Sequence, residues 1–501
     1  MIATSKQART AKCGFVPFMY ALLVAQLLTP GGNIVRAKPA SPADSQVTIA
    51  PAPQGPLRAN FYDTGWLEGD CAYHGASVAS TGKVYFSVST HLAGQWARIY
   101  EFDPSTRRVR RLWSVDQIVP DDGSVVQGKI HAPLTERNGE VFSCTHTSWY
   151  FADHINPLTG AQQNPYPGGY VFAVNTSTGM GRVVGTPMHH APVTGVIGPE
   201  QICMNGEGLI ANIFDSERGL FYVSSWPSGL FAKVDVQTGQ ASLYGSRQGR
   251  CGTVPKEIPG PDGEMILNPN YQRALRTLAL DDDGNVYGSN GKGEIWKYDL
   301  QQDCVVTMNA SMEDATDRQT PETVKHLNMW RTIVWNGHDQ AFYGVHWATS
   351  WLFRYDPRAD TIQPVTAWRA HRALGEELNV DYAQLGLALG PDQTLYGLVH
   401  APPLKKGVMR SVHLITLNLD TKEYIDHGHI LGNDDKTLMF AESCAVSPGG
   451  DVYTVGWVEA APELHAVLKE KRTQGPLETT DEAYVMSLVQ IPAENLSAKR
   501  N

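Results

Sequence analysis

Short apolar runs alternate with Gly- or Asp-rich turns along most of this chain. The clearest copy of the pattern is residues 277–300, TLALDDDGNVYGSNGKGEIWKYDL. Within this copy, the segment from Asp281 to Gly284 can supply the left-handed backbone angles of a tight hairpin turn, and β-branched or aromatic residues flank it. The copy therefore predicts consecutive antiparallel strands joined by tight turns.

The same pattern recurs seven times, at intervals of roughly 40 to 60 residues. The copies begin near His74, His131, Gly206, Arg276, Arg331, Leu385 and Cys444. Units of four short strands at this interval are typical of propeller blades, which bury their faces only by stacking on neighbouring blades. The sequence predicts an all-β protein, a seven-bladed β-propeller of four-stranded antiparallel blades that occupies residues 59–495 as a single domain. A β-sandwich or two barrels is the alternative.

Two further segments precede the predicted propeller. Residues 1–37 combine a basic start, an apolar stretch at 15–28 and a small-residue cleavage site at 35–37, which is typical of a signal peptide. An uncleaved membrane anchor is the other interpretation. Residues 38–58 are rich in Pro and Ala and predict a flexible linker. We expect a secreted or periplasmic monomer with no membrane span after signal cleavage.

The net charge limits the classes of ligand that the protein can bind, and the cysteine content bears on disulfide formation. The formal net charge is -10, which argues against nucleic acid because phosphate binding needs a concentrated basic surface. An acidic ligand stays open if a local cluster of Arg and Lys overrides the global sign. Six cysteines lie outside the predicted signal peptide, which permits disulfides, and their wide spacing gives no connectivity.

Histidines recur at one place in the repeats. In a propeller, residues just before the first strand of a blade and just after its second strand share one face, around the mouth of the central channel. Arg276, Arg331 and Cys444 stand at such positions, and six histidines stand there too, namely His74, His91, His131, His146, His346 and His400. This coincidence predicts a functional site at the channel mouth.

The predicted roles divide these residues into three sets. His131 and His146 are the candidate catalytic pair, since neutral imidazoles can shuttle protons near neutral pH. Arg276 or Arg331 could neutralise a substrate carboxylate through a bidentate contact. The substrate-binding candidates are His74, His91, Arg276, Arg331 and Tyr222.

The third set is a candidate zinc site. His346, His400 and Cys444 come from adjacent predicted blades, and imidazole and thiolate are ligands that zinc prefers. A buried free cysteine beside two histidines is the alternative. We expect no organic cofactor.

The chain resembles the propeller-fold polysaccharide lyases that cleave ulvan. The resemblance rests on three motifs, Gly128-Lys129-Ile130-His131, Cys144-Thr145-His146 and Pro167-Gly168-Gly169-Tyr170, within a similar architecture over roughly residues 60–492. It implies that a uronic acid is opened by β-elimination, with two histidines resembling His131 and His146, a tyrosine and an arginine from the next blade, and a structural zinc.

The predicted third blade departs from that family. It begins Asn205-Gly206-Glu207-Gly208 and its second strand ends Ser224-Ser225-Trp226, so neither tyrosine nor arginine stands at the expected positions. Without that tyrosine, elimination would need His131 or His146 as the base. From the resemblance and this histidine pair, the sequence predicts a secreted lyase acting on an acidic, ulvan-like polysaccharide.

Two other functions stay open at this point. One is a propeller that binds a glycan or a protein without turnover, because tryptophans gather near the predicted rim and aromatic faces are common sugar platforms. These are Trp226, Trp330, Trp347, Trp351 and Trp457. The other is a hydrolase or lactonase, although neither a G-x-S-x-G turn nor an H-E-x-x-H helix is present.

Overall fold

The computed structural model places residues 47–501 in one unit. The residues that it describes are 47–51, 55–92, 94–119, 125–148, 166–185, 207–226, 229–246, 257–259, 265–267, 275–320, 327–370, 386–402, 404, 410–472 and 483–497. The predicted signal peptide lies outside the described residues.

Five separate four-stranded antiparallel sheets follow one another along the chain. The first two contain β3 (Ala76–Val78), β4 (Val84–Val88), β5 (Arg98–Asp103) and β6 (Arg108–Ser114), and then β7 (Thr135–Arg137), β8 (Glu140–Cys144), β9 (Val171–Asn175) and β10 (Gly181–Gly185). The third contains β11 (Gly208–Asp215), β12 (Leu220–Trp226), β13 (Leu230–Asp235) and β14 (Ala241–Ser246). The last two contain β17 (Ala279–Leu280), β18 (Val286–Ser289), β19 (Glu294–Asp299) and β20 (Cys304–Ser311), and then β21 (Trp330–Asn336), β22 (Ala341–His346), β23 (Trp351–Asp356) and β24 (Thr361–Ala367).

The rest of the unit forms a ten-stranded sheet with the order β25-β26-β27-β28-β2-β32-β31-β29, to which β1 and β30 are attached. Its strands are β1 (Thr48–Ile49), β2 (Leu57–Asp63), β25 (Leu387–Leu389), β26 (Thr394–Ala401), β27 (Ser411–Asn418), β28 (Glu423–Gly432), β29 (Leu438–Ala441), β30 (Ala445–Val446), β31 (Val452–Glu459) and β32 (Tyr484–Ile491). The described residues also contain a hairpin of β15 (Glu257–Pro259) and β16 (Met265–Leu267), the helices α1 (His465–Arg472) and α2 (Ala493–Ser497), and short 3-10 turns at Val115–Gln117, Met312–Ala315 and Pro462–Leu464.

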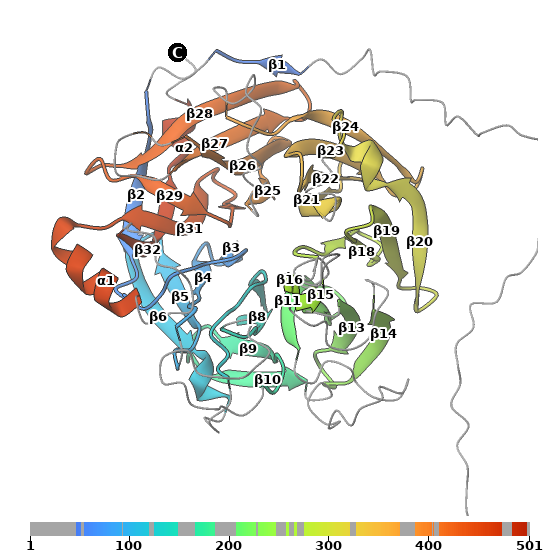
Figure 1. The fold of residues 1–501 in the computed structure, drawn as a ribbon, viewed down its shortest axis with the longest axis horizontal. Helices are drawn as coiled ribbons and strands as arrows, with labels where there is room; N and C mark the ends of the chain where they lie inside the picture. The colour runs from blue at the N-terminus through green and yellow to red at the C-terminus, as the bar shows by residue number, and fades with distance from the viewer. Residues whose placement is uncertain are drawn as a thin grey trace, which may run out of the picture. The chain divides into compact units, whose positions relative to one another are not determined.

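The sheets are arranged as blades around a centre, with the first strands of the four-stranded sheets, and β25 of the ten-stranded sheet, facing it (Figure 1). Strand β11 contacts β17, β17 contacts β21, β21 contacts β25, β25 contacts β30, and β30 contacts β3. The all-β propeller is therefore confirmed. The number seven stays a prediction, because the segments interpreted as blades six and seven belong to one continuous sheet.

Aromatic side chains fill the space between neighbouring blades. Tyr222 on β12 stacks with Phe231 on β13 and contacts Tyr298 on β19, with ring centroids 6.1 and 5.5 Å apart. All three side chains are fully buried. Full burial of a large apolar side chain contributes about 1.5–3 kcal/mol, so stacking of blades stabilises the ring.

An N-terminal strand joins the last part of the ring. Strand β2 pairs antiparallel with β32, with Phe61 opposite Val489, and parallel with β28, with Leu57 opposite Ile430. Strand β1 also pairs with β28. The predicted linker at 38–58 therefore contains short stretches of sheet, because Leu57 is apolar and fully buried there.

The turn at Asp281 forms as predicted. The Gly284 amide donates to the Asp281 carbonyl, and Gly284 has a φ of +86°, in the left-handed region that favours glycine. The Asp281 carboxylate accepts from the Asn285 backbone and from the Tyr287 hydroxyl. These bonds give the acidic segment a structural role in the turn.

The described residues bear on two expectations from the sequence, namely that no segment spans a membrane after signal cleavage and that the cysteines could form disulfides. No described helix combines the length and the apolar character needed to cross a bilayer. The four cysteines in the described part of the chain, Cys71, Cys144, Cys304 and Cys444, are all free thiols.

Candidate functional site

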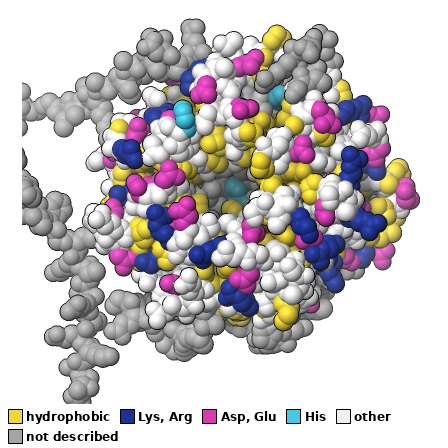
Figure 2. Space-filling view, turned by 180° about the vertical axis from the view of Figure 1, so that it is seen from behind, with side chains coloured by type: hydrophobic (Ala, Val, Ile, Leu, Met, Phe, Trp, Pro, Cys, Tyr) yellow, Lys and Arg dark blue, Asp and Glu magenta, His cyan; other side chains and the backbone are white. Residues whose placement is uncertain are grey.

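Side chains from five sheets meet where the inner strands begin. We call Tyr73, His74, His131, His146, Arg276, Arg331 and Glu442 the channel cluster. Tyr73 and His74 precede β3, His131 precedes β7, Arg276 precedes β17 and Glu442 precedes β30, while Arg331 is the second residue of β21 and His146 follows β8. In the view from the opposite side, the molecule is hollowed at its centre and a histidine side chain is visible inside the hollow (Figure 2).

Three rings form one side of the channel cluster. Tyr73 stacks on His131 with centroids 3.6 Å apart and an interplanar angle of 11°. The ring of His146 lies 5.1 Å from that of His131. The backbone amide of Thr147 donates to His146 Nδ1 at 2.8 Å, so the ring proton of neutral His146 is on Nε2. His131 and His146 therefore lie within a sugar's width of each other, with a phenol alongside.

Two arginines form the other side. Arg331 Nη2 lies 2.6 Å from Glu442 Oε1, and the Arg331 guanidinium lies 4.5 Å from the centroid of Trp347. The Arg276 guanidinium lies 6.0 Å from the same ring. Buried Nε and Nη1 atoms of Arg276, and Nε of Arg331, have no hydrogen-bond partner among the described residues. Such orphaned donors suit an anion, because an unsatisfied buried N–H is costly.

His74 connects the two sides across the ring. Its amide donates to the Glu442 carbonyl at 3.2 Å, and its Nε2 lies 2.9 Å from Thr277 Oγ1. Thr277 Oγ1 donates to the Arg331 carbonyl, so it accepts from His74 Nε2–H. The φ of His74 is +36°, a strained value for a residue with a side chain. The loop before β3 is thus held across the channel at a cost in backbone strain at His74.

The imidazoles of the channel cluster are neutral near pH 7. Burial, followed by the charge of Arg276, holds the pKa of His131 well below 6.5, and burial with the charge of Lys129 does the same to the pKa of His146. Burial and the Arg331 charge lower the pKa of His74 to about 3. Burial lowers the pKa of Arg331 to about 10, so this residue stays cationic. The site therefore combines proton acceptors with positive charge.

These shifts predict a pH dependence of stability. The pKa of His74 falls from 6.5 to about 3 on folding, and that of His346 to about 4. The unfolded chain therefore binds more protons than the folded protein below pH 6.5. The free energy of unfolding is highest above that pH and decreases as the pH falls toward 4. Each such histidine adds a slope of up to about 1.4 kcal/mol per pH unit. Urea unfolding at pH 7 and pH 5 would measure the loss, and equal stabilities at both would contradict it.

The structure does not bring the predicted zinc ligands together. His346 Nε2 donates to Asn328 Oδ1 and its Nδ1 lies 2.9 Å from Thr349 Oγ1, so both ring nitrogens are occupied. His400 lies beside Arg410 and Phe440. Within the described ranges, His346, His400 and Cys444 do not form a group of converging ligand atoms.

The proposed role of Tyr222 in substrate binding also needs correction. Its side chain is fully buried in the aromatic core between blades, away from the channel cluster. Side chains alternate along β12, and Tyr222 takes the face that packs on β19. Several of the candidate tryptophans are packed as well, since Trp226, Trp330 and Trp347 are at most 7% exposed.

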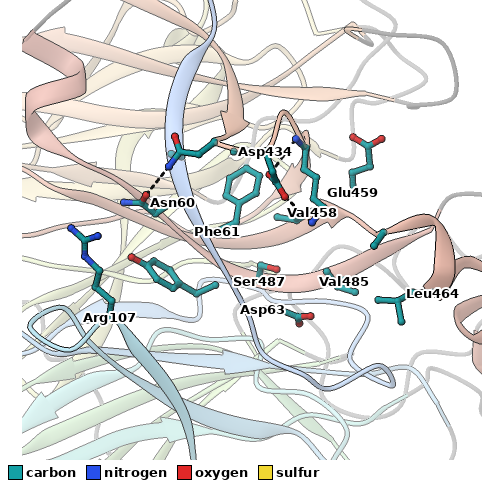
Figure 3. A pocket seen from close by; sticks show the side chains of 16 residues that line it. Asn60, Phe61, Asp63, Arg107, Asp434, Val458, Glu459, Leu464, Val485 and Ser487 are labelled. Atoms are coloured by element: carbon teal, nitrogen blue, oxygen red, sulfur yellow. Dashed lines mark hydrogen bonds and ion pairs between the residues drawn. The ribbon is translucent and has the colours of Figure 1, made fainter.

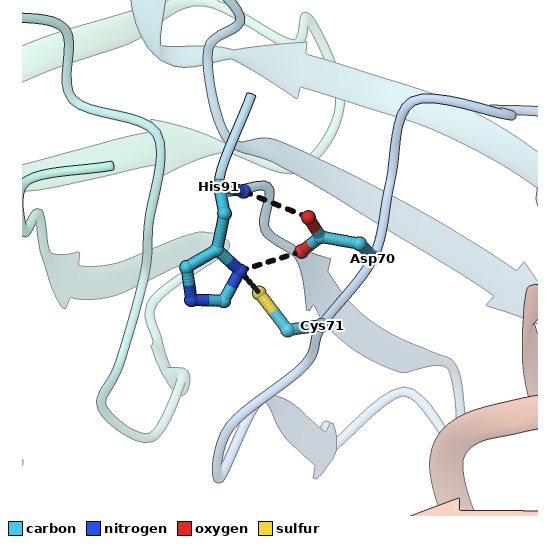
Figure 4. Close-up of side chains that lie close together, drawn as sticks. All are labelled: Asp70, Cys71 and His91. Carbon is cyan, nitrogen blue, oxygen red and sulfur yellow. Dashed lines mark hydrogen bonds and ion pairs between the residues drawn. The ribbon is translucent and has the colours of Figure 1, made fainter. Parts of the chain in front are cut away.

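A different group of three ligand types converges beside the channel cluster. His91 Nδ1 lies 3.0 Å from Asp70 Oδ1 and 3.6 Å from Cys71 Sγ (Figure 4). His91 Nε2 lies 3.5 Å from the hydroxyl of Tyr73. His91, predicted to bind substrate, therefore contacts the channel cluster through its far nitrogen. The resemblance to ulvan lyases implies a structural zinc. This group offers ligand types that zinc binds, namely an imidazole, a thiol and a carboxylate.

A separate pocket of about 420 Å³ lies at the closure of the ring, between β2 and the turn after β28 (Figure 3). Asp434 pairs with Lys436 at 2.7 Å, and the Glu459 carboxylate accepts from the Thr437 amide. None of the residues that line this pocket belongs to the channel cluster. Its polar groups are largely engaged with each other.

Sequence reasoning missed Tyr73 and Glu442. Tyr73 directly precedes His74, and Glu442 lies two residues before Cys444, so both stand at the position where each inner strand begins. The recurring register was the signal that could have found them. Lys129 belongs to the motif that ends at His131, and its side chain is fully buried near His131 and His146, a position that the motif alone does not indicate.

No protein-family model and no curated protein matches this chain. Among solved structures it is similar to a GH74 enzyme from Niastella koreensis, with a TM-score of 0.49 and 10% identity over 79% of this chain and 52% of that one. It is also similar to the extracellular domain of the one-component system BT4673 from B. thetaiotaomicron, with a TM-score of 0.44 and 10% identity over 86% of this chain and 39% of that one. U3-55K gives a TM-score of 0.45 and 10% identity, over 87% of this chain and 100% of that one.

Proposed function

We propose that this protein is a secreted or periplasmic lyase that cleaves a uronic-acid-containing glycan by β-elimination at the channel cluster. The observation that carries the proposal is the pairing of orphaned arginine donors with neutral imidazoles and a phenol in one buried site. The arginine donors can bind a substrate carboxylate. The imidazoles and the phenol can transfer the protons when a carbon-bound proton is removed. An ulvan-like acidic polysaccharide is the proposed substrate.

The arginines would lower the barrier by neutralising the carboxylate. Loss of the proton at C5 places negative charge next to an ionised carboxylate, and fixed positive charge stabilises that state. Arg276 carries no ion pair among the described residues, whereas Arg331 is paired with Glu442. Arg276 is therefore the better candidate to bind the substrate carboxylate, with Arg331 adding charge behind it.

The rings would carry the protons. His131 accepts the C5 proton, the C–H electron pair forms the C4=C5 double bond, the C4–O4 bond breaks with its electrons, and O4 takes a proton. The His131 imidazole is unprotonated near pH 7, because its pKa is lowered well below 6.5, so it can accept a proton. His146 Nδ1 already accepts from the Thr147 amide, which leaves its Nε2–H as a donor. Tyr73, stacked on His131, is a phenol that could protonate O4. This residue from blade one would fill the role that blade three lacks.

A panel of glycans containing glucuronate, iduronate, galacturonate or mannuronate tests the proposal. The full mature protein is mixed with each glycan, and ultraviolet absorbance follows the unsaturated product. A rise with one class is expected. Flat traces across the panel, with no binding, would remove the lyase proposal. Binding without a rise would favour the alternative, a propeller that binds glycans without turnover.

Gly208→Ala should displace His146 within the channel cluster. A β-carbon at Gly208 would overlap the imidazole of His146, so that ring must move. A displacement of about 1 Å at a reacting group can cost about 100-fold in rate, and we expect a loss of that order in kcat. Gly449→Ala is the matched control, because its nearest neighbour is Ser447 Oγ at 3.8 Å. Equal elimination rates for both variants would contradict the role of His146.

A further inference from the structure

The loop before β3 and the end of the second strand of blade one bring three ligand atoms together. Asp70 Oδ1, Cys71 Sγ and His91 Nδ1 all lie within 4.8 Å of one another. Each of the three residues is at most 9% exposed. They supply one carboxylate, one thiol and one imidazole, which is a donor set that suits zinc better than calcium or magnesium.

The separations fit a tetrahedral ion. Zinc bonds of about 2.3 Å to sulfur and 2.0–2.1 Å to nitrogen, at a tetrahedral angle, place those two atoms about 3.5 Å apart. The observed distance from Cys71 Sγ to His91 Nδ1 is 3.6 Å. The corresponding distance from oxygen to nitrogen is about 3.3 Å for an ideal site, and Asp70 Oδ1 to His91 Nδ1 is 3.0 Å.

The surrounding bonds hold the ligands in place. The His91 amide donates to Asp70 Oδ2, which leaves Oδ1 for an ion. The backbone of Cys71 pairs with Ser89 in both directions, at 3.2 and 2.8 Å. Trp457 Nε1 donates to the Asp70 carbonyl at 2.8 Å. The two ligands of the loop are thus fixed by β4 and β31, as the outer contacts of metal sites usually require.

Binding of a divalent ion would displace the proton of the Cys71 thiol, because the thiolate is the form that binds zinc. The ion would then lie between two anionic ligands, the Cys71 thiolate and the Asp70 carboxylate, and would balance their charge.

We propose that Asp70, Cys71 and His91 bind one zinc ion, with a fourth position open to water or another ligand. This site differs from the one predicted at His346, His400 and Cys444, and it does not depend on the proposed lyase activity. An ion on His91 Nδ1 would leave the ring proton on Nε2, which faces the Tyr73 hydroxyl. The ion would then also fix the direction of the hydrogen bond between His91 and the channel cluster.

Elemental analysis of the full-length mature protein, purified without chelators or metal-affinity resin, tests the site. We expect about one equivalent of zinc in the wild type. The zinc content of Cys71→Ser and of His91→Gln should be at least tenfold lower. Cys144→Ser is the matched control, because Cys144 is also buried, while its Sγ lies against the Leu209 carbonyl and Asn212 Nδ2. Its zinc content should equal that of the wild type.

Cobalt substitution gives a second measurement, which reports directly on a thiolate ligand and can be read in the wild-type protein alone. Cobalt in the wild-type protein should show a thiolate-to-cobalt charge-transfer band, which Cys144→Ser retains and Cys71→Ser loses. Less than one-tenth equivalent of zinc together with no cobalt band in folded wild-type protein would overturn the site. Full zinc content in folded Cys71→Ser would overturn it as well, because the ion would then lie elsewhere. Neither result depends on any glycan, so both are separate from failure of the lyase proposal.

Discussion

His131→Ala should lower kcat on a uronate glycan by about 10²–10⁴-fold, the usual contribution of a positioned acid or base. The expected loss follows from the position of this imidazole, which lies between the Tyr73 phenol and His146 and is neutral near pH 7. Initial rates of unsaturated product formation measure the effect. His338→Ala is the control, because His338 is an exposed residue in the turn between β21 and β22, and its rate should stay within twofold of the wild type.

A structural loss must be separated from a catalytic one. His131 is 3% exposed, so truncation to alanine leaves a cavity beside Tyr73. His131→Gln keeps most of the volume and should lose a similar share of kcat, while its unfolding midpoint stays near that of the wild type. If His131→Gln is folded and retains more than half of the wild-type kcat, the histidine does not act in the reaction.

Arg276→Gln should reduce kcat/KM by about 10²–10³-fold, the cost of removing one preorganised group that stabilises developing negative charge. The reason is electrostatic, because Arg276 has orphaned N–H groups and no ion pair among the described residues. The fold should tolerate the change for the same reason. Arg182→Gln is the control, since Arg182 pairs with Glu140 on an exposed surface.

The substrate offers an independent check on Arg276. If this residue binds the carboxylate, methyl esterification of the uronate should remove most of the difference between the wild type and Arg276→Gln. A variant that is equally impaired on the free acid and on the ester would instead indicate a general defect. Wild-type kcat/KM in Arg276→Gln would contradict the assignment outright.

The sequence predicted the propeller because its information is local. Turn residues such as Asp281 and Gly284, between β-branched and aromatic runs, define each hairpin without reference to the rest of the chain. The repeat then places the starts of inner strands together, which is why His131, His146, Arg276 and Arg331 could be assigned to one face. The structure places these four side chains in one cluster, and their chemical roles stay predictions.

Side-chain direction was the part that the sequence could not supply. Tyr222 lies within β12, and its ring packs into the core between blades instead of reaching the rim. His346 lies at a rim position, yet Asn328 and Thr349 occupy both of its nitrogens. The trio of Asp70, Cys71 and His91 depends on a loop crossing toward the end of β4, which no spacing in the sequence reveals.

The nature of the product tests the central claim most directly. Proton NMR of a glycan digest by the mature wild-type protein should show a vinyl proton at C4 and loss of the C5 proton at each new non-reducing end. New chain ends without the vinyl signal would mean hydrolysis, and an unchanged spectrum with every uronate class would mean no cleavage. Either result would contradict β-elimination at the channel cluster.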